Sequence, residues 1–182
     1  MKLLRLCLLL VAIAGPVQLR AQGQPWLLVD THSATLSVIQ DGRVRVRFGD
    51  IAIGRGGVTR LRVRDDDATP LGTFHIAWIN NHSPFHRFFG LDYPNPTYAW
   101  RAFDHNLIGP DTLRRILRGV RDQDHPPQDT PLGGDLGIHG LGDANPWIHR
   151  HLNWTRGCIA LTNRQIDTLS PWVHIGTTVV VR

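Results

Sequence analysis

Two short stretches late in the chain carry residues that could do chemistry together: Gly137–Gly140 and Asn153–Leu161. The first holds His139 and the second holds Cys158. A thiol attacks a carbonyl carbon well only as a thiolate, and a neighbouring imidazole can accept its proton and later return it to a leaving group. The pair therefore predicts nucleophilic catalysis. The alternative is an inert buried cysteine beside a core histidine.

The neighbours of Cys158 favour the catalytic interpretation. Gly157 has no side chain, so the backbone N–H groups of Gly157 and Cys158 could face a developing oxyanion. Arg156 adds positive charge, which favours a thiolate. His139 and Cys158 both stand next to glycine at apparent strand ends, and neighbouring strand ends could bring the two side chains together.

The amino-terminal segment has the pattern of a secretory signal peptide. Lys2 and Arg5 precede an apolar run over 6–14, and small residues follow up to Ala21. The run is too short to span a bilayer, which takes about 20 residues. We therefore predict cleavage of residues 1–21, export to the periplasm and no membrane span in the mature protein. A retained amino-terminal anchor is the alternative.

Cleavage would change both the cysteine count and the charge. It removes Cys7 and leaves Cys158 as the only cysteine, so no intramolecular disulfide is possible. The formal net charge of the whole chain is +5, and losing Lys2, Arg5 and Arg20 leaves 17 basic and 15 acidic residues, a net charge of +2. This small excess gives no support for a nucleic-acid partner.

The composition predicts one mainly β domain over 25–182. The 182-residue chain has 18 Gly and 12 Pro, Lys2 is its only lysine, and it contains no Glu. Because Glu and Lys are strong surface helix formers, this composition excludes a helical bundle. Apolar or alternating runs predict the strands, and 3.6-residue periodicity predicts the helices. The expected strands are 26–30, 35–39, 72–80 and 177–181, and the expected helices are 111–121 and the stretch from an Asn163 cap to just before Pro171.

The segment 81–109 shows no sustained periodicity and is predicted to be a long loop. Its aromatic residues could cover a binding site. They are Phe88, Phe89, Tyr93 and Trp100.

Arginine alternates with apolar residues twice, at 43, 45 and 47 and again at 60, 62 and 64. Alternation with a period of two predicts strands with one face in water. These stripes could bind an anionic cell-wall polymer, but a solvated face is the preferred interpretation.

Two histidine pairs could in principle ligate a metal: His149 with His151, and His82 with His86. Neither pair has a third ligand at a suitable spacing, so no metal site is predicted.

Several ordered motifs resemble the L,D-transpeptidase (YkuD-like) catalytic domain family. His139-Gly140 followed by Thr155-Arg156-Gly157-Cys158-Ile159 is similar to that family's His-Gly and Ser/Thr-x-Gly-Cys signature. Thr69–Phe74 (TPLGTF) is similar to its Thr-Pro-x-Gly-x-Phe stretch. Gly90–Asn95 (GLDYPN) resembles a murein-directed subgroup that carries a Trp-Thr-x-Gly-Cys motif, found here at 154–158. The resemblance covers residues 27–182.

The resemblance implies a small β-sandwich or barrel with one or two peripheral helices. It implies that Cys158 is the nucleophile and His139 the general base and acid, the latter oriented by a main-chain carbonyl at Gly140. Gly157, Gly140 and Thr155 would support the site. Many family members have His where this chain has Arg156, which cannot act as a base. Arg156 could instead orient a substrate carboxylate or lie on the surface, and Asn153 receives no role.

The implied reaction is acyl transfer at peptidoglycan without a cofactor. Cys158 would attack a peptide carbonyl at the diamino acid of a tetrapeptide stem, release D-alanine and form a thioester. An amine from an acceptor stem or from a lipoprotein side chain would then resolve the thioester.

Three alternatives remain open. A hydrolase of the same fold would use water to resolve the thioester. A non-catalytic cell-wall binding module would need neither Cys158 nor His139. A sortase-like enzyme would need an essential arginine after the cysteine, where only Arg164 and Arg182 follow.

Overall fold

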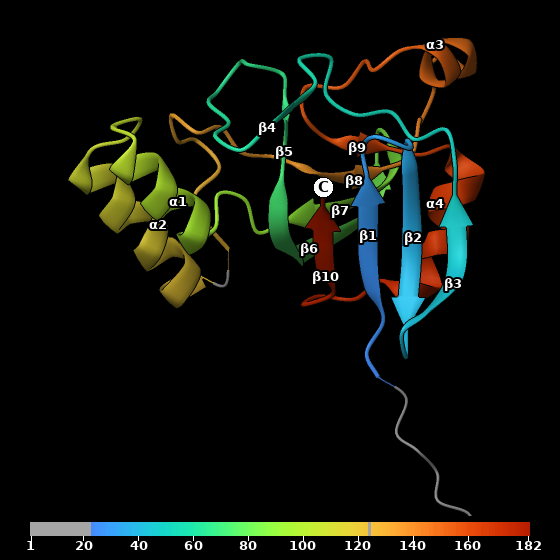
Figure 1. The fold of residues 1–182 in the computed structure, drawn as a ribbon, viewed down its shortest axis with the longest axis horizontal. Helices are drawn as coiled ribbons and strands as arrows, with labels where there is room; N and C mark the ends of the chain where they lie inside the picture. Colours follow the sequence, from blue (N-terminus) through green and yellow to red (C-terminus); the bar gives the residue numbers. More distant parts are fainter. Residues whose placement is uncertain (1–22, 124) are drawn as a thin grey trace, which may run out of the picture.

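The computed structural model describes residues 23–123 and 125–182, and the predicted signal peptide lies outside them. A mixed eight-stranded sheet forms the centre of the domain, in the order β3-β2-β1-β10-β6-β7-β8-β9 (Figure 1). A separate parallel pair joins β4 (Val58–Thr59) to β5 (Thr69–Pro70). The prediction of a mainly β fold is confirmed. The strands of the main sheet are β1 (Trp26–Asp30), β2 (Thr35–Gln40), β3 (Arg43–Phe48), β6 (Gly72–Ser83), β7 (His86–Leu91), β8 (Gly137–His139), β9 (Ile159–Ala160) and β10 (Thr178–Val181).

The apolar run at 26–30 forms a strand, as predicted, whereas in the alternating strand β3 only Phe48 is buried and Val44 is exposed. In β1, Leu27 and Val29 are fully buried while their neighbours are partly exposed. β1 pairs antiparallel with β2 and parallel with β10, which joins the two ends of the described chain in one sheet. β2 and β3 are connected by a tight turn at Asp41-Gly42, where both residues have positive φ.

The prediction of a long loop over 81–109 is wrong. β6 continues to Ser83 and pairs with β7 in a bulged hairpin, and helix α1 (Pro96–Asp104) follows. Phe89 and Tyr93 are buried in the core. Because β7 passes from an exposed start to a fully buried end, its residues show no regular alternation to reveal a strand.

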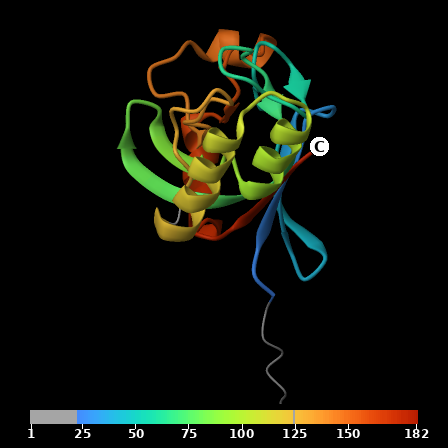
Figure 2. The same cartoon turned by 90° about the vertical axis from the view of Figure 1, so that its left-hand side faces the viewer.

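Four α-helices occur in the described part of the chain, more than the one or two expected. The predicted helix at 111–121 is α2 (Pro110–Gln123), which packs against α1 to one side of the sheet (Figures 1 and 2). The second predicted helix is α4 (Asn163–Leu169), followed by a 3₁₀ turn η1 (Ser170–Trp172). The short helix α3 (Pro146–His151) was not predicted.

The cap of α4 differs from the prediction. Thr162, not Asn163, is the N-cap, and it forms a capping box with Gln165. The Asn163 side chain is therefore free to bind elsewhere, at the turn that follows His139.

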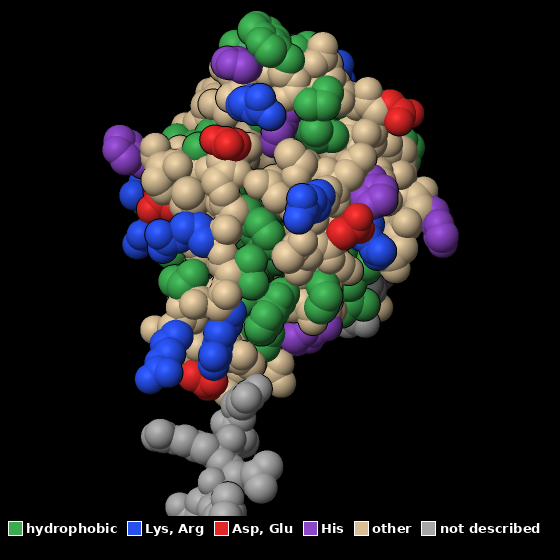
Figure 3. Space-filling view, turned by 90° about the vertical axis from the view of Figure 1, so that its right-hand side faces the viewer, with side chains coloured by type: hydrophobic (Ala, Val, Ile, Leu, Met, Phe, Trp, Pro, Cys, Tyr) green, Lys and Arg blue, Asp and Glu red, His purple; other side chains and the backbone are tan. Residues whose placement is uncertain are grey.

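The two arginine stripes lie in different environments. Arg43, Arg45 and Arg47 lie exposed on the edge strand β3, as predicted. Figure 3 shows this side of the molecule, where basic side chains are spread among neutral surface rather than gathered in one patch. The second stripe is not a strand: β4 ends at Thr59, and a loop carries Arg62 into the interior with only 5% of its surface exposed.

None of the helices in the described ranges has the length and apolar character needed to cross a bilayer.

Candidate active site

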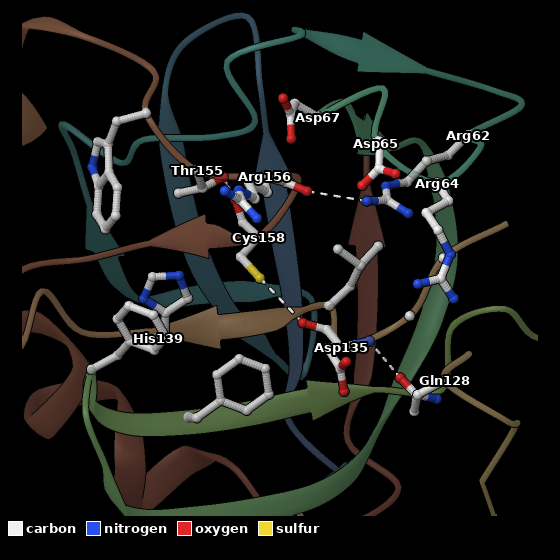
Figure 4. A pocket seen from close by; sticks show the side chains of 16 residues that line it. Arg62, Arg64, Asp65, Asp67, Gln128, Asp135, His139, Thr155, Arg156 and Cys158 are labelled. Carbon is white, nitrogen blue, oxygen red and sulfur yellow. Dashed lines mark hydrogen bonds between the residues drawn. The ribbon is translucent and has the colours of Figure 1, made fainter. Parts of the chain in front are cut away.

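The pairing of β8 and β9 brings Cys158 and His139 together. The strands are parallel, with Ile138 opposite Ile159, so Cys158 directly before β9 stands opposite Gly137. Side chains of a strand alternate between the two faces, and opposite residues share a face. Cys158 and His139 therefore lie on the same face as diagonal neighbours, and both line one pocket (Figure 4). The structure thus joins the two residues that the sequence singled out.

His139 is buried and held in one tautomer. Its Nδ1 lies 2.7 Å from the carbonyl oxygen of Gly140. Because a carbonyl oxygen only accepts hydrogen bonds, Nδ1 carries the proton and Nε2 is left as the basic nitrogen. The expected orientation of the histidine by a carbonyl at Gly140 is present in this geometry.

Three aromatic side chains surround the His139 ring. The Phe85 ring centre lies 4.5 Å away, Phe88 is stacked at 6.1 Å, and Trp154 meets the ring edge-on at 5.9 Å. Burial lowers the pKa of His139, against the opposing effect of the Gly140 hydrogen bond. The imidazole is therefore neutral at neutral pH and able to accept a proton.

The Cys158 thiol is also neutral at rest. Burial raises its pKa to about 11, although the residue is partly exposed to the pocket. Its Sγ donates a hydrogen bond to the carbonyl oxygen of Asp135 at 3.5 Å. A nucleophilic role would therefore require a base, and the unprotonated Nε2 of His139 lies on the same face of the sheet.

The turn before Cys158 is closed by Thr155. Its Oγ1 accepts from the Gly157 N–H at 3.2 Å and donates to the Cys158 carbonyl at 2.7 Å. Thr69 Oγ1 donates to the Gly157 carbonyl at 3.0 Å. Gly157 has a φ of +115°, a conformation that side chains rarely adopt.

This turn refines the expectation for the oxyanion donors. The Gly157 N–H already donates to Thr155, so it is not free to face a substrate oxygen. Of the two N–H groups expected to face an oxyanion, only that of Cys158 is not used by these hydrogen bonds.

The pocket around Cys158 has a volume of about 480 Å³. One wall is aromatic and contains His139, and the opposite wall is charged (Figure 4). Arg156 is exposed on the charged wall. Of the aromatic residues expected to cover the site, only Phe88 lines it. The lining residues outside the aromatic wall are Arg62, Arg64, Asp65, Asp67, Gln128, Gly133, Gly134, Asp135, Leu136, Thr155, Arg156 and Cys158.

Two amides that the sequence analysis did not assign to the site support it from behind. The Asn163 Oδ1 accepts from the N–H groups of Leu141 and Gly142 at 2.8 and 3.0 Å, which fixes the turn after His139. The Gln128 Oε1 accepts from the Asp135 N–H at 2.6 Å, which holds the peptide directly before the residue whose carbonyl faces the thiol. Long-range contacts of this kind leave no periodic signal in the sequence.

The histidine pairs do not form a metal site in the described part of the chain, where no group of three potential ligands occurs. His149 is buried and its Nδ1 accepts a long hydrogen bond from Trp154 Nε1 at 3.4 Å. His151 stacks on Trp147 at the surface, and His86 pairs with Asp167.

Comparison with known proteins gives a family and a fold. The family model described as "L,D-transpeptidase catalytic domain" matches residues 24–181. No curated protein sequence matches the chain.

Solved structures share the fold at low sequence identity. The helical cell shape determining protein Pgp2 from Campylobacter jejuni aligns with a TM-score of 0.58 at 21% identity, over 87% of this chain and 47% of that one. Bd1075 from Bdellovibrio bacteriovorus gives 0.55 at 18% identity, over 89% and 48%. An L,D-transpeptidase from Xylanimonas cellulosilytica gives 0.50 at 16% identity, over 90% and 62%. The chain thus spans about half the length of the first two, and these likenesses show the fold alone.

Proposed function

Because the chain belongs to the L,D-transpeptidase catalytic domain family, we propose that it is a cysteine acyltransferase acting on peptidoglycan stem peptides. The observation that carries the proposal is the placement of Cys158 and His139 on one face of two adjacent parallel strands, in one pocket. A non-catalytic wall-binding module would have no need of a histidine whose basic nitrogen is left unprotonated beside a thiol.

The first half-reaction forms a thioester. His139 Nε2 takes the thiol proton, and Cys158 Sγ attacks the peptide carbonyl at the diamino acid of a tetrapeptide stem. The negative charge that develops on the carbonyl oxygen is stabilised by the Cys158 N–H. The C–N bond then breaks, D-alanine leaves with the proton returned by His139, and the acyl group stays on sulfur.

The second half-reaction transfers the acyl group to an amine. His139 takes a proton from the attacking amine of an acceptor stem or a lipoprotein side chain, an amide forms, and the thiol is regenerated. Arg156 lies exposed on the charged wall of the pocket, where its guanidinium can pair with a substrate carboxylate. Thr155, Gly157 and Gly140 hold the backbone around the two reacting side chains.

One observation favours a hydrolase as the second candidate. A transferase must admit an amine and keep water away, and a covering segment would help it to do so. Phe89 and Tyr93 are in the core, and Trp100 is on α1, away from the residues that line the pocket. Water could therefore resolve the same thioester.

Product analysis with a tetrapeptide muropeptide separates the two outcomes. The purified protein is incubated with the muropeptide alone and with an excess of a D-amino acid as the amine acceptor, and the products are identified by mass spectrometry. Exchanged or cross-linked products support the transferase. If only shortened stems appear, however much amine is added, a hydrolase replaces the transferase as the proposed function.

We also propose that the domain over 25–182 acts in the periplasm after removal of residues 1–21. Support comes from the basic, apolar and small-residue order of that segment. Amino-terminal sequencing of the mature protein should give a start near Gln22, or near Gly15 if an earlier site is used. An intact segment 1–14 on the native protein would indicate a membrane anchor instead.

A further inference from the structure

Arg62 is a buried cation at the Cys158 pocket, although the sequence pattern predicts it on the solvent-exposed face of a strand. It lies in the loop between β4 and β5 and is 5% exposed. Burying a guanidinium is costly unless its donors are satisfied. The Arg62 guanidinium is nevertheless buried next to the Cys158 pocket, which Arg62 also lines.

The guanidinium binds three backbone carbonyls from three separate segments. Nε donates to Ala68 at 3.0 Å, Nη1 donates to Leu132 at 2.8 Å, and Nη2 donates to Arg156 at 3.1 Å. The last of these bonds is drawn in Figure 4. Residues 65–67, 133–136 and 154–158, which adjoin or contain these carbonyls, supply lining residues of the pocket. One side chain therefore ties three parts of the pocket together.

Two glycines leave room for this arrangement. A Cβ on Gly157 would lie 2.7 Å from the Ala68 carbonyl oxygen and 3.1 Å from Arg62 Nε. A Cβ on Gly133 would lie 2.2 Å from Arg62 Nη1. Gly157, directly before the nucleophile, is thus required for close approach to the guanidinium as well as for its positive φ.

The Arg62 side chain is itself held in place. Its backbone N–H donates to the Tyr98 hydroxyl at 2.7 Å, and the guanidinium carbon lies 5.7 Å from the centre of the Tyr93 ring. The carboxylate of Asp66 is 3.6 Å from Nε. The positive charge of Arg62 also opposes the effect of burial on the pKa of Cys158.

We propose that Arg62 is a positioning residue for the nucleophile: by binding the Arg156 carbonyl it fixes the Arg156–Gly157 peptide plane. The conformation of Gly157, and with it the direction of the Cys158 N–H one peptide further on, depends on that plane. The inference rests on the proposed role of Cys158. A guanidinium carries its donors on three separate nitrogens and so reaches carbonyls of three segments, whereas a lysine ammonium presents all its donors from one nitrogen. Substitution of Arg62 by Lys or by Gln can therefore separate the effect of its hydrogen-bond geometry from the effect of its charge.

Two reactions of the purified protein test the inference without peptidoglycan. With iodoacetamide, the thiolate displaces iodide and forms an S–C bond, and no oxyanion develops. With p-nitrophenyl acetate, the thiolate adds to the carbonyl carbon, an oxyanion forms, and p-nitrophenolate leaves to give the thioester. Rates are measured at about pH 9 for the wild type, Arg62→Lys and Arg62→Gln, and the ester rate of Cys158→Ala is subtracted. Arg60→Gln is the matched control, because Arg60 is an exposed arginine of the same stripe.

Arg62→Lys keeps the charge and loses the geometry. We expect its alkylation rate to stay within about twofold of wild type and its acylation rate to fall about tenfold or more. Arg62→Gln should slow both reactions, since it also removes the charge, and Arg60→Gln should change neither. Melting curves identify which variants are folded.

A folded Arg62→Lys whose acylation-to-alkylation ratio equals that of wild type would overturn the proposal. Failure of both Arg62 variants to fold would assign Arg62 to stability alone and would overturn it as well. Because neither reaction uses a stem peptide, these outcomes are distinct from failure of the proposed function.

Discussion

At the scale of single residues, burial sets the protonation of the candidate pair. It raises the pKa of Cys158 to about 11 and lowers the pKa of His139, so the resting pair is a neutral thiol and a neutral imidazole. This differs from a preformed thiolate and imidazolium. Under the proposed mechanism, His139 removes the thiol proton during attack, and no thiolate is formed beforehand.

His139→Ala should therefore slow acylation far more than alkylation. We expect the acylation rate with p-nitrophenyl acetate near neutral pH to fall by about 10²–10⁴. Alkylation by iodoacetamide depends on thiolate formed by titration, so it should rise with pH towards a midpoint near 11 in the wild type and change little in the variant. Stopped-flow absorbance and mass spectrometry measure the two rates. A thiolate midpoint below 8 in the wild type would contradict the neutral pair.

At the scale of elements, the site depends on the turn from Thr155 to Cys158 as well as on two strands. Thr155 is 4% exposed and closes this turn through two hydrogen bonds of its hydroxyl. Without the hydroxyl, the Gly157 N–H and the Cys158 carbonyl would lose these partners. Leaving a buried polar group without a hydrogen-bond partner costs about 1–3 kcal/mol.

Thr155→Val should therefore lower the free energy of unfolding by about 1–3 kcal/mol and also reduce acylation of Cys158. Thr155→Ser is the matched control, since it keeps the hydroxyl and should preserve both properties. Urea unfolding and ester acylation measure the two effects. Equal stability of the valine and serine variants would show that the turn does not need the hydroxyl.

Sequence patterns predict some elements well and others poorly, for physical reasons. The apolar run of β1 and the apolar spacing of α2 reflect the residues that each element buries, so both are visible in the sequence. α1 and α3 are short, and their clearest signals were the Asn-Pro pairs at 95–96 and 145–146, where each Asn caps the helix. Helices of nine and six residues are too short for apolar periodicity to distinguish them from a loop.

The candidate site shows the same division. Cys158, His139 and Gly140 could be found from local motifs, whereas Arg62 could not. An alternating stripe predicts exposure, but the three carbonyls that bind Arg62 come from residues 68, 132 and 156. Only the tertiary fold makes burial of that charge acceptable.

At the scale of the whole molecule, buried histidines make stability depend on pH. Burial lowers the pKa of His149 as well as that of His139, and His149 Nε2 is buried without a hydrogen-bond partner in the described structure. In the unfolded chain both titrate near 6.5. As the pH falls below that value, the unfolded state binds protons that the folded state resists, so stability falls.

His149→Gln should flatten this decline. Glutamine does not titrate, and its carbonyl can still accept from Trp154. We expect the melting temperature of the variant to fall less than that of the wild type between pH 7 and pH 5, with the two proteins similar to each other at pH 8. Thermal unfolding followed by circular dichroism measures both slopes. Parallel slopes would mean that protonation of His149 does not limit acid stability.

The central claim is that Cys158 carries the acyl group. Intact-protein mass spectrometry after incubation with a tetrapeptide muropeptide and a rapid acid quench tests it most directly. We expect an adduct equal to the muropeptide less D-alanine, located on Cys158 by fragmentation, strongly reduced in His139→Ala and absent in Cys158→Ala. Turnover of the muropeptide by Cys158→Ala, or an adduct on another residue, would contradict the account.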